Sequence, residues 1–315
     1  MRPKVYKKKM NTVKNNNNLN PLFIGFGKQA LEYARVFKYL NIDITAVFIR
    51  NLKKNQGNLK KYAVKNTYTN LEKALKEKKF NCVFVFLPWN LIEKKIAFIL
   101  KNTNKDIYSE KPLALSLKKI LYIDNLTKKL NRKLFILYNR RYYSTFELIK
   151  KKINKKKFEF LVTIPEKRTK LITNFDYRLD GKIKYHLTSH WIDFFTSLFN
   201  MPISSFYKKK KLYFFKFKSK NLDSNLISIN YDEPGKIWAK IKTNKETYLF
   251  KTLEKVYKMN KKTKRYKILI DEKKINNFKP GILSLVKAIK DKKKIKLPKT
   301  LDLIKIYKYL QKLPY

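Results

Sequence analysis

The fold is decided by the stretch Leu22-Phe23-Ile24-Gly25-Phe26-Gly27-Lys28-Gln29-Ala30. Its three apolar residues are typical of a short buried strand, and the segment 29–40 that follows is amphipathic with a helical period. Gly25 permits a tight turn, Gly27 lets the backbone approach a pyrophosphate, and the small Ala30 lets the helix pack closely against the strand. Because the amino end of a helix favours phosphate groups, this strand–turn–helix predicts a dinucleotide-binding site.

The same alternation continues through the first half of the chain. Runs typical of strands occur at 22–24, 44–49, 82–87, 106–108 and 134–138, and segments typical of helices at 29–40, 71–76, 90–100 and 117–130. Asn90 and Glu93 have the spacing of a capping box that would open the third of these helices. Strands that alternate with helices of this length predict βαβ units and a parallel sheet, an α/β domain of the Rossmann type.

The pattern changes after Arg141. Strand-like runs follow one another at 158–164, 212–217, 226–231, 236–241, 247–256 and 266–270, with one helix expected at 185–199 and closing helices at 282–289 and 301–313. Strands without intervening helices predict an α+β domain with a large, mostly antiparallel open sheet. We therefore expect a flexible basic tail over residues 1–19, a Rossmann domain over 20–140 and a second domain over 141–315.

The chain carries 76 Lys and Arg against 23 Asp and Glu, a formal net charge of +53. Clustered cations bind nucleic acids because they displace counterions from the phosphates. Here the lysines are spread over the whole sequence and accompany many Asn, Ile, Phe and Tyr residues, a mixture typical of an A+T-rich genome. A basic nucleic-acid-binding protein is therefore the less favoured alternative, although some non-specific adhesion to polyanions is expected.

Three further features bear on the compartment. Cys82 is the only cysteine and lies in an apolar run, so no intramolecular disulfide is possible. The basic N-terminus is followed by Asn15 to Asn18 and not by the apolar core of a signal peptide. No apolar run approaches the length that crosses a bilayer. We expect a cytoplasmic protein without a transmembrane segment.

A second motif, Ser109-Glu110-Lys111-Pro112, follows the strand-like run at 106–108. Ligands of open α/β sheets bind outside the carboxyl ends of the strands, so Lys111 is expected in the cofactor crevice. A lysine there can donate to a carbonyl oxygen or accept the proton of a carbinol. After the second strand, where an acidic residue usually binds the ribose of NAD, the chain has Arg50. This favours NADP over NAD, unless Arg50 is only a solvated surface cation.

Further residues complete a family resemblance. Pro88, Glu110-Lys111-Pro112, Asn139-Arg140-Arg141-Tyr142-Tyr143 and His190-Trp191-Ile192-Asp193 follow the glycine motif in the order of the glucose-fructose oxidoreductase/inositol dehydrogenase (Gfo/Idh/MocA) family. The spacings are similar too, and the resemblance runs from about Pro21 to the end of the chain. It is most specific at Glu110-Lys111-Pro112.

The resemblance implies an NAD(P)-dependent oxidoreductase that transfers hydride between nicotinamide and a sugar, nucleotide sugar or cyclitol. It makes Lys111 and His190 the catalytic residues. The expected cofactor-binding residues are Gly25, Phe26, Gly27, Lys28, Gln29, Arg50, Pro88, Glu110 and Lys111. The expected substrate-binding residues are Arg140, Arg141, Tyr142, His186 and Asp193. The second sheet is expected to make homo-oligomer contacts. Asp193, one turn after His190, could instead only hold its helix in place, and the two arginines could be surface cations.

The chain departs from the family pattern at three places. His186 stands four residues before His190, where the family commonly has Asp; Ile92 stands where relatives often have His; and the acidic residue for the ribose is absent. The two histidines have the spacing of a zinc pair, but no cysteine or carboxylate cluster accompanies them, so no metal is expected. The departures leave open a relative that binds the dinucleotide but has lost catalysis.

Overall fold

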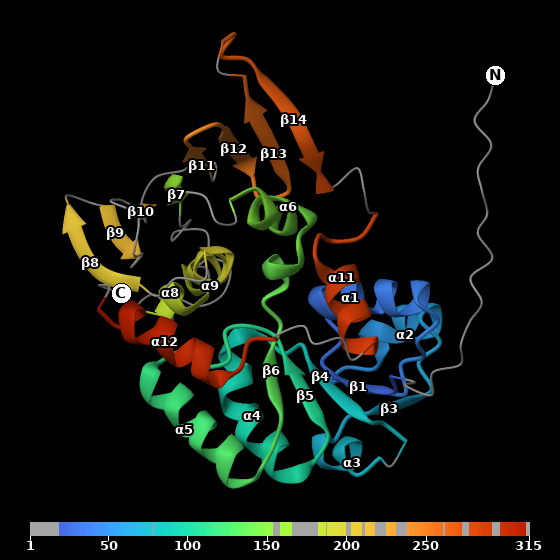
Figure 1. The fold of residues 1–315 in the computed structure, drawn as a ribbon. Coiled ribbons are helices and arrows are strands. Elements are labelled where there is room, and N and C mark those ends of the chain that lie inside the picture. Colours follow the sequence, from blue (N-terminus) through green and yellow to red (C-terminus); the bar gives the residue numbers. More distant parts are fainter. Residues whose placement is uncertain are drawn as a thin grey trace, which may run out of the picture.

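The structure is a computed structural model. It describes residues 19–77, 79–153, 158–165, 182–186, 188–199, 203–209, 212–217, 225–230, 238–260, 262–272, 277–291 and 297–312. Apart from Leu19, the tail expected at the N-terminus lies outside these residues. The described part contains a six-stranded and an eight-stranded sheet (Figure 1).

The first sheet has the strand order β3-β2-β1-β4-β5-β6, and its paired strands are parallel. Its strands are β1 (Pro21–Ile24), β2 (Ala46–Phe48), β3 (Asn66–Tyr68), β4 (Cys82–Val85), β5 (Asp106–Ser109) and β6 (Leu134–Ile136). From β1 the chain adds β2 and β3 on one side of the sheet and then β4, β5 and β6 on the other, so the strand order reverses between β1 and β4. Ligands of doubly wound sheets bind at the carboxyl ends of such a pair of strands. The predicted Rossmann domain is confirmed.

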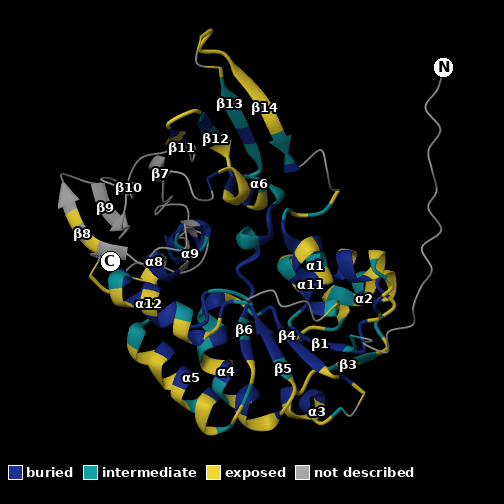
Figure 2. Ribbon diagram, in the orientation of Figure 1, coloured by how far each residue is buried: buried dark blue, intermediate teal, exposed yellow. Residues whose placement is uncertain are grey.

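Helices cover both faces of this sheet (Figure 1). On one face lie α1 (Lys28–Tyr39), α2 (Gln56–Lys61) and α11 (Ile282–Lys290); on the other lie α3 (Leu71–Leu75), α4 (Trp89–Asn102) and α5 (Leu117–Lys129). Leu22 and Ile24 pack on the second of these faces and Phe23 on the first, so β1 is apolar throughout. Figure 2 shows the central strands of this sheet buried and the outer sides of the helices exposed.

Two expectations for this domain are corrected. No capping box opens α4: Pro88 is its N-cap, Asn90 lies inside the helix, and the Glu93 carboxylate accepts a hydrogen bond from the Leu115 backbone N–H (2.8 Å). The sheet also contains β3, which was not predicted because the run Asn66–Tyr68 has no apolar alternation and is only partly buried at the sheet edge.

The second sheet has the order β14-β13-β12-β11-β7-β10-β9-β8. Its strands are β7 (Phe158–Pro165), β8 (Ile203–Lys209), β9 (Leu212–Phe217), β10 (Asn225–Asn230), β11 (Trp238–Thr243), β12 (Thr247–Thr252), β13 (Lys255–Met259) and β14 (Tyr266–Asp271). Adjacent strands of this sheet pair antiparallel, except β7 and β10, which are parallel. The predicted large, mostly antiparallel sheet is confirmed.

Two expectations for this sheet are also corrected. The single strand predicted at 247–256 is the hairpin of β12 and β13, which turns at Leu253 and Glu254. β8 was not predicted, because Ser204, Ser205 and the closing lysines interrupt its apolar pattern.

Helices at the junction connect the two sheets. They are the short η2 (Asn139–Tyr142), α6 (Ser144–Ile153), α8 (Ile183–His186), α9 (Thr188–Phe199) and α12 (Thr300–Leu310). α8 and α9 replace the one helix predicted at 185–199, with residue 187 outside the described part. One buried apolar cluster runs from the first sheet through α5, α12 and α9 to β11 and β12. Because α11 and α12 pack against helices of the first sheet, the domain boundary after residue 140 stays a prediction.

Within the described part of the chain, no helix combines the length and the apolar character needed to span a membrane.

Candidate functional site

The turn between β1 and α1 leaves an open cradle at the amino end of α1. Gly25 has a φ of +94°, and a Cβ there would lie 2.9 Å from the Phe86 carbonyl oxygen, so the position requires glycine. Gly27 is the N-cap of α1, and a Cβ on it would meet nothing within 4 Å. Leu31 is the first residue whose N–H bonds within the helix, to the Gly27 carbonyl (3.1 Å). The preceding N–H groups are thus placed to receive a pyrophosphate, and the cradle fits a dinucleotide.

The two glycines predict different outcomes for two substitutions. Gly27→Leu is expected to leave the unfolding midpoint of the free protein nearly unchanged, because its side chain enters open space, but to abolish the rise in midpoint that a bound dinucleotide causes. Gly25→Ala is the matched control, which should lower the midpoint of the free protein itself. Differential scanning fluorimetry measures both. A dinucleotide-induced rise that survives Gly27→Leu would place the ligand elsewhere.

A hydrogen-bond network joins the first turn of α1 to the end of β5. The Glu110 N–H bonds to the Val85 carbonyl of β4 (2.9 Å). One carboxylate oxygen of Glu110 accepts from the Gln29 side-chain amide (2.9 Å), and the other from the Lys111 N–H (3.3 Å). Burial raises the pKa of Glu110, while the Lys111 and Lys279 cations and these hydrogen bonds oppose the shift. The Glu-Lys-Pro turn is therefore held against the cradle.

Lys111 lies half-buried two residues beyond β5. The Lys111–Pro112 peptide bond is cis. Pro112 to Leu115 are buried, and the Tyr307 hydroxyl of α12 donates to the Ala114 carbonyl (2.9 Å). The backbone after Lys111 is thus packed from two sides, which fixes the base of this side chain at the carboxyl edge of the sheet.

His190 comes to the same edge from α9. Its ring is 4% exposed and its centroid lies 5.3 Å from that of Tyr138, which follows β6. The Tyr138 hydroxyl donates to Ser189 Oγ (3.3 Å), and Ser189 donates to the Tyr185 carbonyl (2.6 Å). His190 therefore lies against the residue that follows β6, and β6 pairs with β5, the strand that leads to Lys111. Tyr138 carried no motif, and only its place at the end of a predicted strand could have pointed to it.

Arg141 and Asp193, both expected against the substrate, bind each other. Arg141 Nε donates to Asp193 Oδ2 (2.8 Å), and Nη2 donates to Oδ1. The Asp193 side chain is fully buried and that of Arg141 is 16% exposed. Burial raises the pKa of Asp193, and the Arg141 guanidinium opposes that shift. The pair ties η2 to α9 one turn beyond His190.

The other residues predicted at the substrate are placed as follows. Arg140 is half-buried in η2 and hydrogen-bonds the neighbouring Tyr143, although burial still raises the pKa of Tyr143 to about 12. Tyr142 is buried, and its hydroxyl has no hydrogen-bond partner among the described residues. His186 ends α8, with its side chain outside the described part.

The other residues predicted at the cofactor are placed as follows. Phe26 is buried against the rings of Phe23 (6.3 Å) and Tyr62 (6.4 Å), and Lys28 is exposed at the start of α1. Arg50 is exposed just after β2, ahead of the short helix η1 (Lys53–Asn55). Pro88 is exposed between β4 and α4.

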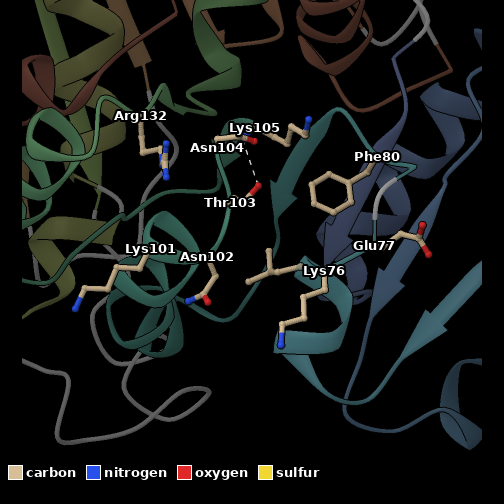
Figure 3. Close-up of a pocket in the computed structure, with 10 residues that line it drawn as sticks. Lys76, Glu77, Phe80, Lys101, Asn102, Thr103, Asn104, Lys105 and Arg132 are labelled. Atoms are coloured by element: carbon tan, nitrogen blue, oxygen red, sulfur yellow. Dashed lines mark hydrogen bonds between the residues drawn. The ribbon is translucent and has the colours of Figure 1, made fainter.

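A hollow of about 550 Å³ lies at the opposite edge of the first sheet (Figure 3). Phe80, Thr103 and Arg132 are among the residues that line it, and they precede β4, β5 and β6. Ligands of doubly wound sheets bind at the carboxyl ends of the strands, so this hollow is not the dinucleotide site.

Comparison with known proteins gives a family match for the first part of the chain and a fold for nearly all of it. Residues 19–138 match the model of the oxidoreductase family with an NAD-binding Rossmann fold, GFO_IDH_MocA. No curated protein matches the sequence. Nearly the whole chain superposes on solved structures, and at the identities found this likeness shows the fold.

Three of these structures illustrate the range of proteins with this fold. The dehydrogenase MviM from Clostridium difficile has a TM-score of 0.73 at 18% identity, over 94% of this chain and 98% of that one. A putative NADPH-dependent oxidoreductase from Desulfitobacterium hafniense has a TM-score of 0.72 at 15% identity, over 94% of both chains. A super-repressor mutant of Gal80p from Saccharomyces cerevisiae has a TM-score of 0.73 at 12% identity, over 93% of this chain and 94% of that one.

Residues 19–138 therefore match the Gfo/Idh/MocA family of NAD-binding oxidoreductases, and the described chain has the fold of the solved oxidoreductases that resemble it.

Proposed function

We propose that the protein is a dehydrogenase or reductase that transfers hydride between NAD(P) and a CH–OH group of a sugar, nucleotide sugar or cyclitol. The observation that supports the proposal is that three features follow strands of the first sheet at their carboxyl ends. These are the open cradle of α1, the half-buried Lys111 after β5, and His190 held from the second part of the chain against Tyr138.

Each residue has a role that its position supports. The cradle at the start of α1 would hold the dinucleotide, whose nicotinamide would supply the hydride-transfer chemistry. In the oxidative direction, Lys111 Nζ holds the carbinol oxygen and takes its proton as the C–H bond gives up hydride; in the reductive direction, it returns the proton to the carbonyl oxygen. His190 exchanges a proton with the same oxygen or with Lys111. The Arg141–Asp193 pair keeps α9, and with it the His190 ring, in place.

A turnover screen tests the proposal. The purified protein is incubated with NAD+ or NADP+ and a panel of sugars, nucleotide sugars and cyclitols, and reduced nicotinamide is followed by its absorbance. The proposal expects saturable turnover on at least one member of the panel. Binding of the dinucleotide without turnover on any of them, in either direction, would contradict it.

We further propose NADP(H) as the preferred cofactor, because Arg50 follows β2 where an acidic residue would select NAD. Lys53 and Lys54 come next in η1, and no acidic residue lies between Phe48 and Asn55. A 2′-phosphate would find cations there.

The effect of Arg50→Ala tests this preference. Loss of a charge-assisted hydrogen bond to the 2′-phosphate is expected to weaken NADPH binding by roughly 10- to 100-fold and to leave NADH binding unchanged. The control is Lys60→Ala, which removes an exposed cation from the nearby helix α2. Isothermal titration calorimetry gives both affinities, and an equal loss for NADH and NADPH would count against a 2′-phosphate site.

A non-catalytic dinucleotide-binding protein is the second candidate. It is favoured by His186, which stands where the family commonly has Asp, and the same fold occurs in the Gal80p super-repressor. This candidate expects stabilisation by a dinucleotide together with no turnover in the screen above. A basic nucleic-acid-binding protein is the weaker alternative, because the positive charge is spread over the whole chain.

We also propose a cytoplasmic homo-oligomer that assembles through the second sheet. The edge strand β14 exposes large apolar side chains at Tyr266 (43%), Ile268 (45%) and Leu269 (36%), which supports burial of this edge by another subunit. Multi-angle light scattering gives the assembly mass, and a monomer at all concentrations would rule out this assembly.

A further inference from the structure

We propose that Lys279, in the segment that leads into α11, is a further cofactor-binding residue that places its cation beside the pyrophosphate of the dinucleotide. This inference rests on the proposed function, because it requires a dinucleotide in the α1 cradle. Lys279 lies 250 residues after Gln29 and belongs to no motif of the sequence.

The Lys279 side chain reaches the first turn of α1. Its Nζ donates to the Oε1 of Gln29 at 2.6 Å. Gln29 is the second residue of α1, and its own amide group donates to Glu110 at 2.9 Å. Lys279 Nζ is therefore one hydrogen bond away from the turn whose backbone N–H groups face the cradle.

The backbone on both sides of Lys279 is anchored. The Phe278 ring packs against Tyr39 of α1 with centroids 5.0 Å apart. The Asn139 side-chain amide donates to the Pro280 carbonyl (3.3 Å). Gly281 has a φ of +77°, and a Cβ there would lie 2.2 Å from the Asn139 carbonyl oxygen, so the chain passes η2 in direct contact. These contacts set the position of Lys279, although its side chain is exposed.

The charges around the cradle favour an anion. Glu110 is the acidic group that faces Lys279, and Lys111 stands beside the same carboxylate. Two cations therefore accompany one carboxylate, and the hydrogen-bond acceptor of Lys279 in this structure is a neutral amide. Phosphate oxygens are stronger acceptors for an ammonium group than a neutral amide, so a pyrophosphate in the cradle is expected to draw Lys279 Nζ towards it.

Binding of NADH and of ADP-ribose tests the inference, because ADP-ribose retains the pyrophosphate and lacks the nicotinamide. Lys279→Gln is expected to weaken both ligands by about tenfold, since a charge-assisted hydrogen bond is lost. The difference from wild type should shrink at high salt, where exposed charges are screened. Lys279→Arg, which keeps the charge, should restore most of the affinity of both ligands.

Two control variants separate a local contact of Lys279 from a general effect of charge. Lys287→Gln removes an exposed cation from α11 and should bind both ligands like wild type. Lys38→Gln removes an exposed cation from the last turn of α1 and should do the same. A loss in either control as large as that in Lys279→Gln would overturn the direct role.

The failure of this inference differs from the failure of the proposed function. If wild-type protein binds neither NADH nor ADP-ribose, the proposed function fails first and the inference with it. If wild-type protein binds both and Lys279→Gln binds them equally well, the inference alone fails. Calorimetry supplies the affinities, and unfolding midpoints of the free variants confirm that each is folded.

Discussion

Lys111→Met is expected to lower the turnover rate by a factor of about 10² to 10⁴, the range typical of a lost general acid or base. Methionine keeps much of the length of the side chain but cannot hold or move a proton. Dinucleotide affinity should change far less, because the cradle is built from α1 and not from this side chain. The rate is measured by nicotinamide absorbance and the affinity by calorimetry.

The pH at which this variant is assayed matters, because Lys111 affects the pKa of Glu110. Lys111 is the main cation that opposes the raised pKa of Glu110, so its removal is expected to raise that pKa further. Rates should therefore be compared over a series of pH values, because Glu110 is expected to stay protonated to a higher pH in the variant than in the wild type. Lys118→Met, which removes an exposed lysine from α5, is the control. A Lys111→Met enzyme with wild-type rates would remove the proposed proton transfer.

Asp193→Asn is expected to lower the free energy of unfolding by about 3 kcal/mol, because it leaves the mostly buried Arg141 guanidinium without its counter-charge. Urea unfolding followed by circular dichroism measures the change. This loss lies near the lower end of the range for buried ion pairs, because the Arg141 side chain is 16% exposed.

The double variant Arg141→Met/Asp193→Leu tests whether the loss of stability comes from leaving a buried charge unpaired. Replacement of both charges by apolar groups is expected to recover most of the stability. Turnover should recover less than stability, because the packing that positions His190 is altered. Asp193→Asn with wild-type stability would show that the ion pair contributes little to the fold.

The sequence predicts the parts of this fold that have strong local signals. The stretch 22–30 combines strand residues, two glycines and the first turn of a helix within nine residues, and the structure has β1 and the start of α1 there. Both sheets were predicted from runs of apolar residues. Short elements without such runs, such as β3, could not be predicted because edge pairing, and not their composition, defines them.

The predictions fail where a residue in a local sequence motif binds a partner that is distant in the sequence. Glu93 has the spacing of a capping residue for Asn90 but accepts from Leu115, 22 residues later in the chain. Arg141 and Asp193, assigned to the substrate from family order, form a pair 52 residues apart. Lys279 is one of many lysines in the sequence, and only its contact with Gln29 marks it.

The most direct test of the central claim is thermal unfolding of the wild-type protein with NAD+, NADH, NADP+ and NADPH, at a salt concentration that suppresses adhesion of phosphates to a chain of charge +53. We predict that one redox pair raises the midpoint in a concentration-dependent way, by the equivalent of about 2.7 kcal/mol at a ligand concentration of about 100 times Kd. The absence of a shift with all four dinucleotides would contradict the claim that this fold binds a nicotinamide cofactor.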